Sequence, residues 1–323
     1  MKHHLVSLFF LFPILGFSQS FILSGYVTDS TTGEALIGAS VHEKNTQKGA
    51  ATNRYGFFSL SIPRTNTTVK QITISYVGYQ SYFIQLPSRI DTNVRINLVP
   101  ASQMLKEVAV TAESEQQRSF SGIVSIPMDR IKKIPVIFGE PDLIKAISLL
   151  PGVSIGNEGT TSLLVRGGTP DQNLILLDEA TVYNVSHLFG FVSVFNTDAL
   201  KNVDLYKAGF PARFGGRLSS VLDITMKEGN NQERKGEWSL GLLSSRFLWE
   251  GPFSEKTKGR TSFMLSGRAS YWGLYTLPFY IGFLRGEEDQ YFTYWMYDLN
   301  AKLNHKFKNG GQLFASFYRG IDT

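Results

Sequence analysis

The chain has 323 residues and a formal net charge of +5 at pH 7, a length that allows two or three ordinary domains. It contains no cysteine, which excludes disulfides, thiolate metal sites and a cysteine nucleophile. Charged residues make up 18% of the chain, below the roughly 25% of an average soluble domain. The 30 glycines and 24 phenylalanines favour β-structure with many turns. No block of Lys or Arg stands out, so no nucleic-acid partner is predicted.

The N-terminus has a basic start at Lys2 and an apolar run over residues 5–17. That run is shorter than the roughly 20 residues of a membrane-spanning helix. Together with a small-x-small site, the pattern predicts a secretory signal peptide over residues 1–18, cut between Ser18 and Gln19. The alternative is a buried N-terminal strand or helix. No later apolar run reaches the length of a membrane helix, so a membrane crossing would have to use β-strands.

Residues 21–99 contain short strand-like runs separated by turn residues. Their spacing predicts a small antiparallel β-sandwich of six or seven strands. The segments SGYVTDSTTGEALIGASV, ATNRYGFFSLSIP and ITISYVGYQS resemble the carboxypeptidase regulatory-like domain of secreted and outer-membrane proteins. In this resemblance Phe57, Ile74 and Val77 would belong to the core. The interpretation we favour is that the sandwich serves only as a packing and spacing domain and does no chemistry of its own.

The name of that domain raises the alternative of a zinc peptidase. The five histidines are His3, His4, His42, His187 and His305, and none begins an H-x-x-E or H-E-x-x-H arrangement that could hold one metal. His42 is predicted to be a solvent-facing strand residue. The sequence therefore predicts no metal, no cofactor and no enzymatic activity.

Residues 100–125 have the composition of a linker, and residues 128–134 are predicted to form a short segment. A helix is predicted from Asp142 to Leu150, because its apolar residues fall on one face and Pro151 stops it. This helix should pack on a sheet formed from residues 162–225. The strands predicted for that sheet are 163–165, 174–177, 203–206 and 221–224.

The segments DLIKAISLLPGVSI, LLVRGGTPDQNLILLDEATVYNVSHLFGFVSVFN and DLYKAGFPARFGGRLSSVLDI resemble the plug domain of TonB-dependent outer-membrane receptors. The resemblance is to the Bacteroidetes type, which carries the regulatory-like domain in front. It implies an α+β plug over residues 126–228 that sits inside a barrel and blocks it. The residues of the plug motif are Arg166, Gly167, Gly168, Asp178, Arg213, Gly215, Gly216 and Arg217.

One position departs from that family, which has Asp-Gly where this chain has Asp178-Glu179. Glycine adopts a positive φ without steric cost, so a glutamate there predicts a changed or strained turn. Asp178, Glu179 and Asp204 are expected to be turn or surface acids and not a catalytic pair. Two interpretations are open for Arg166, Arg213 and Arg217. The resemblance favours pairing with carboxylates of the barrel wall; alternatively they face solvent, as most arginines in proteins do.

The linker contains a strand-like patch, EVAVTA, ahead of the plug. It resembles the TonB box, which in this family pairs with an energy-transducing protein of the periplasm. Backbone hydrogen bonds supply the affinity in strand addition, so such a box tolerates a loose sequence. An ordinary linker strand is the alternative. The box residues are Glu107, Val108, Ala109, Val110, Thr111 and Ala112.

Residues 236–323 alternate an apolar or aromatic face with a polar face over segments of about ten residues, which is the pattern of outer-membrane strands. We expect four or five strands, because residues 236–250 form either one strand or a tight hairpin. The short turn at Asn309-Gly310 and residues 252–259 would be periplasmic, and residues 273–290 extracellular. A soluble antiparallel sheet with one wet face is the alternative. The residues expected to form an interfacial aromatic girdle are Tyr271, Trp272, Tyr294, Trp295 and Tyr297.

The predicted fold class is mainly β: a small antiparallel β-sandwich, an α+β plug domain, and the first strands of an incomplete transmembrane β-barrel. Four or five strands cannot form a closed barrel around a plug. We therefore expect a truncated gene product or gene fragment that does not transport alone. The predicted function is the N-terminal portion of a TonB-dependent receptor in the outer-membrane lipid. Its expected partners are a TonB-type protein and an unknown extracellular ligand; the sequence leaves open whether a surface lipoprotein also binds. The alternative is a secreted or surface-attached binding or adhesion module without transport activity.

Overall fold

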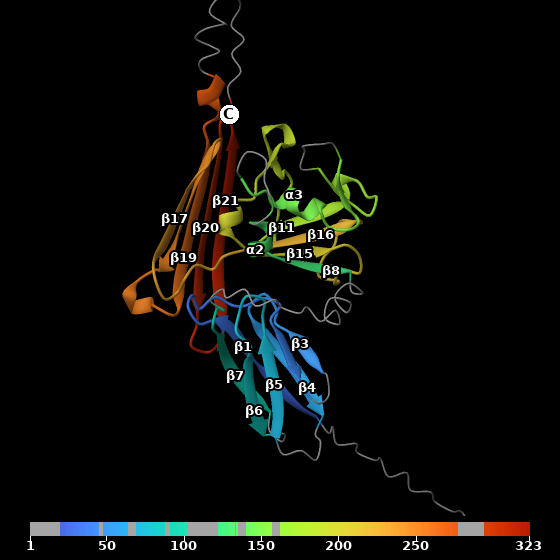
Figure 1. Ribbon diagram of the computed structural model, residues 1–323, viewed down its shortest axis with the longest axis vertical. Helices are drawn as coiled ribbons and strands as arrows, with labels where there is room; N and C mark the ends of the chain where they lie inside the picture. The colour runs from blue at the N-terminus through green and yellow to red at the C-terminus, as the bar shows by residue number, and fades with distance from the viewer. Residues whose placement is uncertain are drawn as a thin grey trace, which may run out of the picture.

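A computed structural model of the chain describes residues 20–44, 48–63, 69–87, 91–101, 122–132, 134, 140–156, 162–276 and 294–323. The predicted signal peptide with its cleavage site and the predicted TonB box lie outside these residues, as does most of the predicted extracellular loop. Three parts follow one another: an N-terminal sandwich, a central domain and a C-terminal sheet. Figure 1 shows the central domain beside the long strands of the C-terminal sheet, with the sandwich below both.

The N-terminal sandwich has seven strands in two sheets, ordered β4-β1-β7 and β3-β2-β5-β6. The sequence predicted a purely antiparallel sandwich. The structure differs in one pair, because the first and last strands run parallel. The chain passes through the second sheet between them, which gives the long connection that a parallel pair requires. The strands are β1 (Ser20–Asp29), β2 (Ser40–Glu43), β3 (Gly49–Ala51), β4 (Phe57–Pro63), β5 (Val69–Ser75), β6 (Tyr82–Pro87) and β7 (Thr92–Leu98).

The core of the sandwich follows the alternation of its strands. Ile74 is fully buried, as predicted. The prediction for Phe57 is wrong by one residue: Phe58 is the buried ring, and Phe57 lies half-buried against Tyr26. The prediction for Val77 is also wrong, because it follows the end of β5 in a turn and is 66% exposed.

The central domain contains a five-stranded sheet of order β12-β11-β16-β15-β8, in which β11 and β16 are parallel. Helix α3 (Leu143–Ser148) begins at Asp142, whose side chain accepts the Lys145 amide, and buries Leu143, Ile144 and Ile147, as predicted. These residues share one core with the sheet. The sheet strands are β8 (Ile123–Pro127), β11 (Asn173–Leu177), β12 (Ala180–Thr181), β15 (Leu200–Tyr206) and β16 (Ser220–Met226).

Short elements connect these strands. Helix α2 (Met128–Ile131) follows β8, and the hairpin of β9 (Val153–Ile155) and β10 (Leu163–Val165) follows α3. A second hairpin, β13 (Ser186–His187) with β14 (Val192–Ser193), encloses the 3-10 turn η3 (Leu188–Gly190). The described part of the chain also has the 3-10 turns η2 (Pro170–Gln172) and η4 (Thr197–Ala199) in the central domain and η5 (Glu255–Thr257) between β18 and β19.

The C-terminal sheet is an antiparallel meander of five strands in sequence order. Residues 236–250 form a hairpin closed at Gly241–Ser244, which settles the expected count at five. Strands β17 and β21 each have one neighbour among the described strands. The strands are β17 (Lys235–Leu240), β18 (Ser244–Pro252), β19 (Thr261–Ser270), β20 (Met296–Lys306) and β21 (Gln312–Asp322).

The two faces of the C-terminal sheet have opposite polarity. The face toward the central domain buries Ser266, Asp298 and Asn300, whereas Tyr297 and Leu299 on the other face are exposed. A soluble sheet buries its apolar face, so this arrangement is that of a sheet facing lipid. Tyr294, predicted for the aromatic girdle, is instead buried and donates a hydrogen bond to Asp322. Its side chain follows the inward alternation of β20.

The turns of the C-terminal sheet divide between its two ends. Residues 307–311 and 253–260 lie at the end beside the sandwich, and the Lys306 amide donates to the Arg260 carbonyl at 2.8 Å. The turn at Gly241 and the segment that follows β19 lie at the opposite end (Figure 1). Within the part of the chain that the structure describes, no helix is long and apolar enough to cross a membrane.

Candidate functional site

Ion pairs join the central domain to the polar face of the C-terminal sheet. The first group, the Arg268 cluster, consists of Glu140, His187, Arg268, Asp298 and Asp322. The Arg268 side chain is 1% exposed; its Nη1 lies 2.7 Å from Glu140 Oε1 and its Nε donates to Asp298 Oδ2 at 2.7 Å. Nη2 donates to the Ser193 carbonyl at 2.7 Å. One guanidinium therefore ties strand β19 to the segment before α3 and to β14.

His187 completes the Arg268 cluster. Its Nε2 lies 2.8 Å from Asp298 Oδ1 and its Nδ1 lies 2.5 Å from Asp322 Oδ1. A neutral imidazole has one N–H, so donating to both carboxylates requires the charged form. Burial lowers the pKa of His187, but the hydrogen bond and charge of Asp298 and the charge of Asp322 outweigh burial and raise it. The charged His187 therefore contributes its full stabilisation of the folded state below the ordinary pKa of 6.5. That contribution is lost as the pH rises through the raised pKa.

Glu140 is the acidic residue of the central domain in the same cluster. Burial raises the pKa of its carboxyl, but the charge of Arg268 and the hydrogen bond from Ser244 lower it further than burial raises it. Ser244 Oγ donates to Glu140 Oε2 at 2.6 Å. No sequence pattern marked Glu140, His187 or Arg268, because these residues are far apart in the chain and become neighbours only when the sheets pack.

The second contact is a buried pair of Asp178 with Lys302. Lys302 Nζ lies 2.9 Å from Asp178 Oδ2 and donates to the Met226 carbonyl at 3.1 Å. Asp178 Oδ1 also accepts the Met226 amide at 3.0 Å. Asp178 lies in the turn between β11 and β12, one of the two places expected, but it is not at the surface: its carboxylate is buried against the C-terminal sheet.

The turn between β11 and β12 is strained, as the Asp178-Glu179 departure predicted. Asp178 has a φ of 47° and Glu179 a φ of 72°, a region that non-glycine residues rarely adopt. Glu179 forms an ion pair with Arg54 of the N-terminal sandwich, and Arg54 Nη2 lies 2.6 Å from Asp223 Oδ2. The residue that replaces the family's glycine thus contacts the sandwich, through the same arginine as Asp223.

The third group, the Glu228 cluster, consists of Glu34, Lys201, Glu228 and Lys306. Glu228 lies 3.4 Å from both Lys201 and Lys306, and its amide donates to Glu34 Oε1 at 2.7 Å. Burial raises the pKa of Glu228, but the charges of Lys201, Lys306 and Lys302 lower it to about 2. All three parts of the chain meet at this cluster.

The three motif arginines do not pair with the C-terminal sheet. Arg166 is exposed, Arg213 lies 3.7 Å from Asp223 of its own domain, and Arg217 donates to the Gly216 carbonyl. Among the described residues, Arg268, Lys302 and Lys306 of the C-terminal sheet pair with carboxylates of the central domain. In the other direction, Asp298 and Asp322 of the sheet pair with His187 of the central domain and not with a motif arginine.

The motif glycines shape the loops beside these arginines. Gly167 and Gly216 both have a φ of 79°, which favours glycine. At Gly168 a Cβ atom would lie 2.4 Å from Ser219 Oγ, so the close approach of two loops requires glycine there. Gly215 has open space around it, and nothing in the structure explains its identity.

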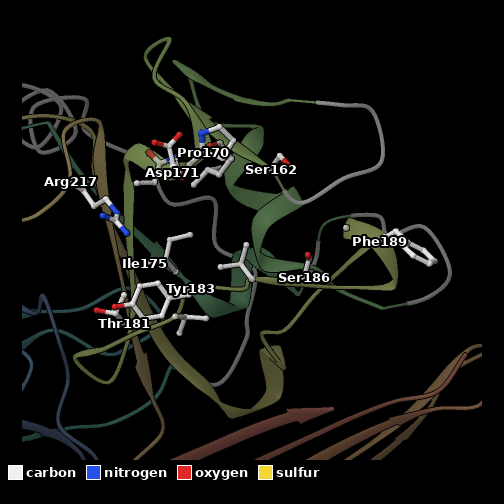
Figure 2. A pocket seen from close by; sticks show the side chains of 14 residues that line it. Ser162, Pro170, Asp171, Ile175, Thr181, Tyr183, Ser186, Phe189 and Arg217 are labelled. Carbon is white, nitrogen blue, oxygen red and sulfur yellow. Dashed lines mark hydrogen bonds between the residues drawn. The ribbon is translucent and has the colours of Figure 1, made fainter. Parts of the chain in front are cut away.

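A cavity of about 420 Å³ opens beside these loops, and Figure 2 shows Arg217 and Asp171 on one side of it and Phe189 on the other. Tyr183 and Ser186 also line it. Within the described part of the chain, no group of three or more His, Asp or Glu side chains is placed to hold a metal. The cavity is a candidate binding site for an organic ligand.

Comparisons with known proteins agree with this architecture. The CarboxypepD_reg-like domain family matches residues 23–110, and the TonB-dependent Receptor Plug Domain family matches residues 115–220. The chain carries the regulatory-like and plug domains of a TonB-dependent receptor. The central domain is therefore the plug. Both curated relatives below are receptors of this kind, and the chain is accordingly placed at the bacterial outer membrane, as predicted.

TonB-dependent receptor SusC of Bacteroides thetaiotaomicron is 29% identical over 67% of this chain and 22% of its own length. TonB-dependent receptor P26 of Formosa agariphila is 26% identical over 69% of this chain and 22% of its own length. The chain thus spans less than a quarter of the length of these relatives. Among solved structures, the outer membrane transporter YddB from Escherichia coli covers 57% of this chain and 31% of its own at 16% identity, with a TM-score of 0.39.

The strained turn leads to the first testable prediction. Glu179→Gly relieves a positive φ that costs roughly 1–2 kcal/mol in an L-residue, whereas Glu179→Gln keeps the strain; both remove the ion pair with Arg54. The Glu179 side chain is 57% exposed, so loss of the pair alone should cost little. Hydrogen exchange of residues 174–182 should therefore show a higher opening free energy in the glycine variant than in the glutamine variant. Equal protection in the two variants would contradict the claim that the positive φ of Glu179 strains the turn.

Proposed function

We propose that the chain forms the gate of an outer-membrane receptor for energy-coupled uptake of an extracellular ligand. The observation that carries this proposal is the polar seam between the plug and the C-terminal sheet. Of the described residues in that sheet, only Leu248 and Met264 are fully buried members of the plug's apolar core. Tyr318 packs on this core partly buried. Most other described contacts are hydrogen bonds and ion pairs, which water can replace when the two surfaces separate. Such a seam can hold the plug and still open.

The cavity at Arg217 supports a role in ligand contact. Its lining combines a guanidinium and a carboxylate with Tyr183 and Phe189, whose side chains are largely exposed. Binding sites for organic ligands combine apolar surface with a few polar groups that fix orientation in this way. We assign the ligand to this face of the plug.

The position of β8 supports the proposed TonB partner. The segment Glu107–Ala112 precedes β8, and β8 is an edge strand that pairs only with β15 among the described strands. A TonB-type protein that adds a strand to this segment would pull first on an edge strand of the plug sheet, which is held by one neighbouring strand. Opening would begin at β8 and move toward the ligand cavity.

The test uses the full gene product in cells that take up a labelled ligand, identified by comparing a deletion strain with its parent over a panel of nutrients. Deletion of residues 107–112 is expected to reduce uptake to the level of a protonophore-treated parent, while the receptor stays at normal abundance in the outer membrane. Deletion of six residues elsewhere in the linker, 113–118, serves as the matched control. Undiminished energy-dependent uptake without residues 107–112 would refute the assignment of the box.

A further inference from the structure

A basic pocket of about 470 Å³ lies where the N-terminal sandwich meets two turns of the C-terminal sheet. One wall comes from β1 and β7 of the sandwich. The opposite wall comes from residues 259–260 and from residues 306–312 around the β20–β21 turn. Asn231 and Gln232, which follow the plug, close the pocket between them.

The pocket carries an excess of positive charge. Arg95, Arg260, Lys306 and Lys308 line it, and the lining contains no Asp or Glu. Lys306 pairs with Glu228 behind the pocket. Within the described part of the chain, the other three cations form no ion pair. Three positive charges around one cavity repel one another, so an anion bound among them relieves that repulsion.

Backbone contacts hold the pocket in shape. Lys306 Nζ donates to the Gly33 carbonyl at 2.7 Å, and the Asn231 amide donates to the Thr32 carbonyl at 2.9 Å. The Gly259 amide donates to the Asn231 carbonyl at 2.7 Å. Since these bonds tie both walls and the segment between them, the backbone around the pocket needs little rearrangement to bind a ligand.

Hydrogen-bonding side chains of the sandwich face the same cavity. Parallel pairing of β1 with β7 places Tyr26 beside Arg95 and Thr28 beside Asn97. Strand alternation directs these four residues to one face, opposite to the buried Val27. The pocket thus adds hydroxyl and amide groups to its charges.

The location of the pocket indicates which anion it meets. Phe307 at its rim is 47% exposed, and Phe253 in the neighbouring turn is 62% exposed. Exposed aromatic rings at the ends of membrane strands lie at the level of the lipid head groups. Guanidinium groups bind phosphate through paired hydrogen bonds, and lysines add charge. We propose that this pocket binds a phosphate group, supplied by the head group of an anionic phospholipid in the adjoining leaflet.

This site would give the N-terminal sandwich a function of its own, separate from that of the plug. A phospholipid head group held between β7 and the β20–β21 turn bridges the sandwich to the C-terminal sheet at the membrane surface. The ligand would thereby keep the sandwich docked beside the plug.

The experiment measures binding of fluorescent phosphatidylglycerol to the full-length receptor in detergent, with phosphatidylcholine and inorganic phosphate as competitors. The test variant combines Arg95→Gln with Lys308→Gln. The control variant combines Lys235→Gln with Lys258→Gln, which removes two exposed charges of the same region outside the pocket. All four side chains are exposed, so neither variant endangers folding.

A charge beside an anionic lipid surface contributes about 5-fold to binding, so the test variant should bind phosphatidylglycerol about 25-fold more weakly. The control variant should bind like the parent, and phosphatidylcholine should compete poorly. If inorganic phosphate competes at the same concentration as the lipid and depends on the same two residues, the phosphate site stands and its source is soluble phosphate. Equal binding by the test and control variants would overturn the proposal.

Discussion

Cross-linking the plug to the C-terminal sheet is expected to abolish uptake by the full-length receptor. Asn196 Nδ2 donates to Ser266 Oγ at 2.7 Å across the seam, and both side chains are buried. The natural sequence has no cysteine in these 323 residues, so the pair Asn196→Cys and Ser266→Cys can be joined selectively by a short, reversible thiol cross-linker. Because a gate that is covalently held to its wall cannot move, uptake should fall to background and return on reduction.

The controls separate the loss of movement from the loss of the hydrogen bond. Each single cysteine variant treated with the same reagent should transport. The pair Ser245→Cys and Ala269→Cys joins directly opposed residues of β18 and β19 within the C-terminal sheet. That cross-link should leave uptake intact. Transport that persists after complete cross-linking of positions 196 and 266 would show that the plug does not separate from this surface.

The second large effect is expected from Arg268→Met, which keeps most of the side-chain volume. The substitution leaves Glu140 buried without its cation and Asp298 with His187 as its remaining charged partner. Breaking a buried ion pair from one side costs about 3–5 kcal/mol. Helix α3 and β14 should therefore exchange their amide protons much faster in hydrogen-exchange measurements on the full-length receptor. The seam would be weakened at the point where three segments of the plug converge.

Two further variants test this explanation. Adding Glu140→Gln to Arg268→Met removes the buried carboxylate that has lost its cation. The double variant should therefore regain part of the protection from hydrogen exchange. Arg319→Met removes an exposed arginine of β21 that forms no ion pair with a described residue, and should have little effect. If both arginine variants exchange alike, the Arg268 cluster does not hold the plug.

Local patterns in the sequence predicted local structure well. The apolar face and the start of α3, the strands β10 and β11, and the hairpin turn at Asn309-Gly310 all depend on neighbouring residues, whose propensities decide the backbone. The position of Glu179 also proved informative, because a positive φ is a property of one residue. Errors of a single residue, as at Phe57, arose where a turn fixed which face of the strand points inward.

The ion pairs across the seam could not be predicted in this way. Glu140 and Arg268 are 128 residues apart, and His187 and Asp322 are 135 residues apart. Their partnership depends on how two sheets pack, and single residues of common types give no periodic signal. The general rule that charged residues lie in turns or at the surface placed Asp178 in a turn but missed its burial, because the rule takes no account of a second polar surface that covers it.

The attachment of Glu228 has a mechanical consequence. The segment that leaves β16 is fastened to the sandwich through Glu34 and to the C-terminal sheet through Lys306. The first strand of the plug sheet along the chain, β8, is an edge strand held by one neighbour. A tension applied ahead of β8 therefore meets its weakest resistance at the near end and its firmest anchor at the far end. If the plug is pulled from the segment ahead of β8, as proposed, its strands should separate from that side first, while β16 stays attached to the other two parts of the chain.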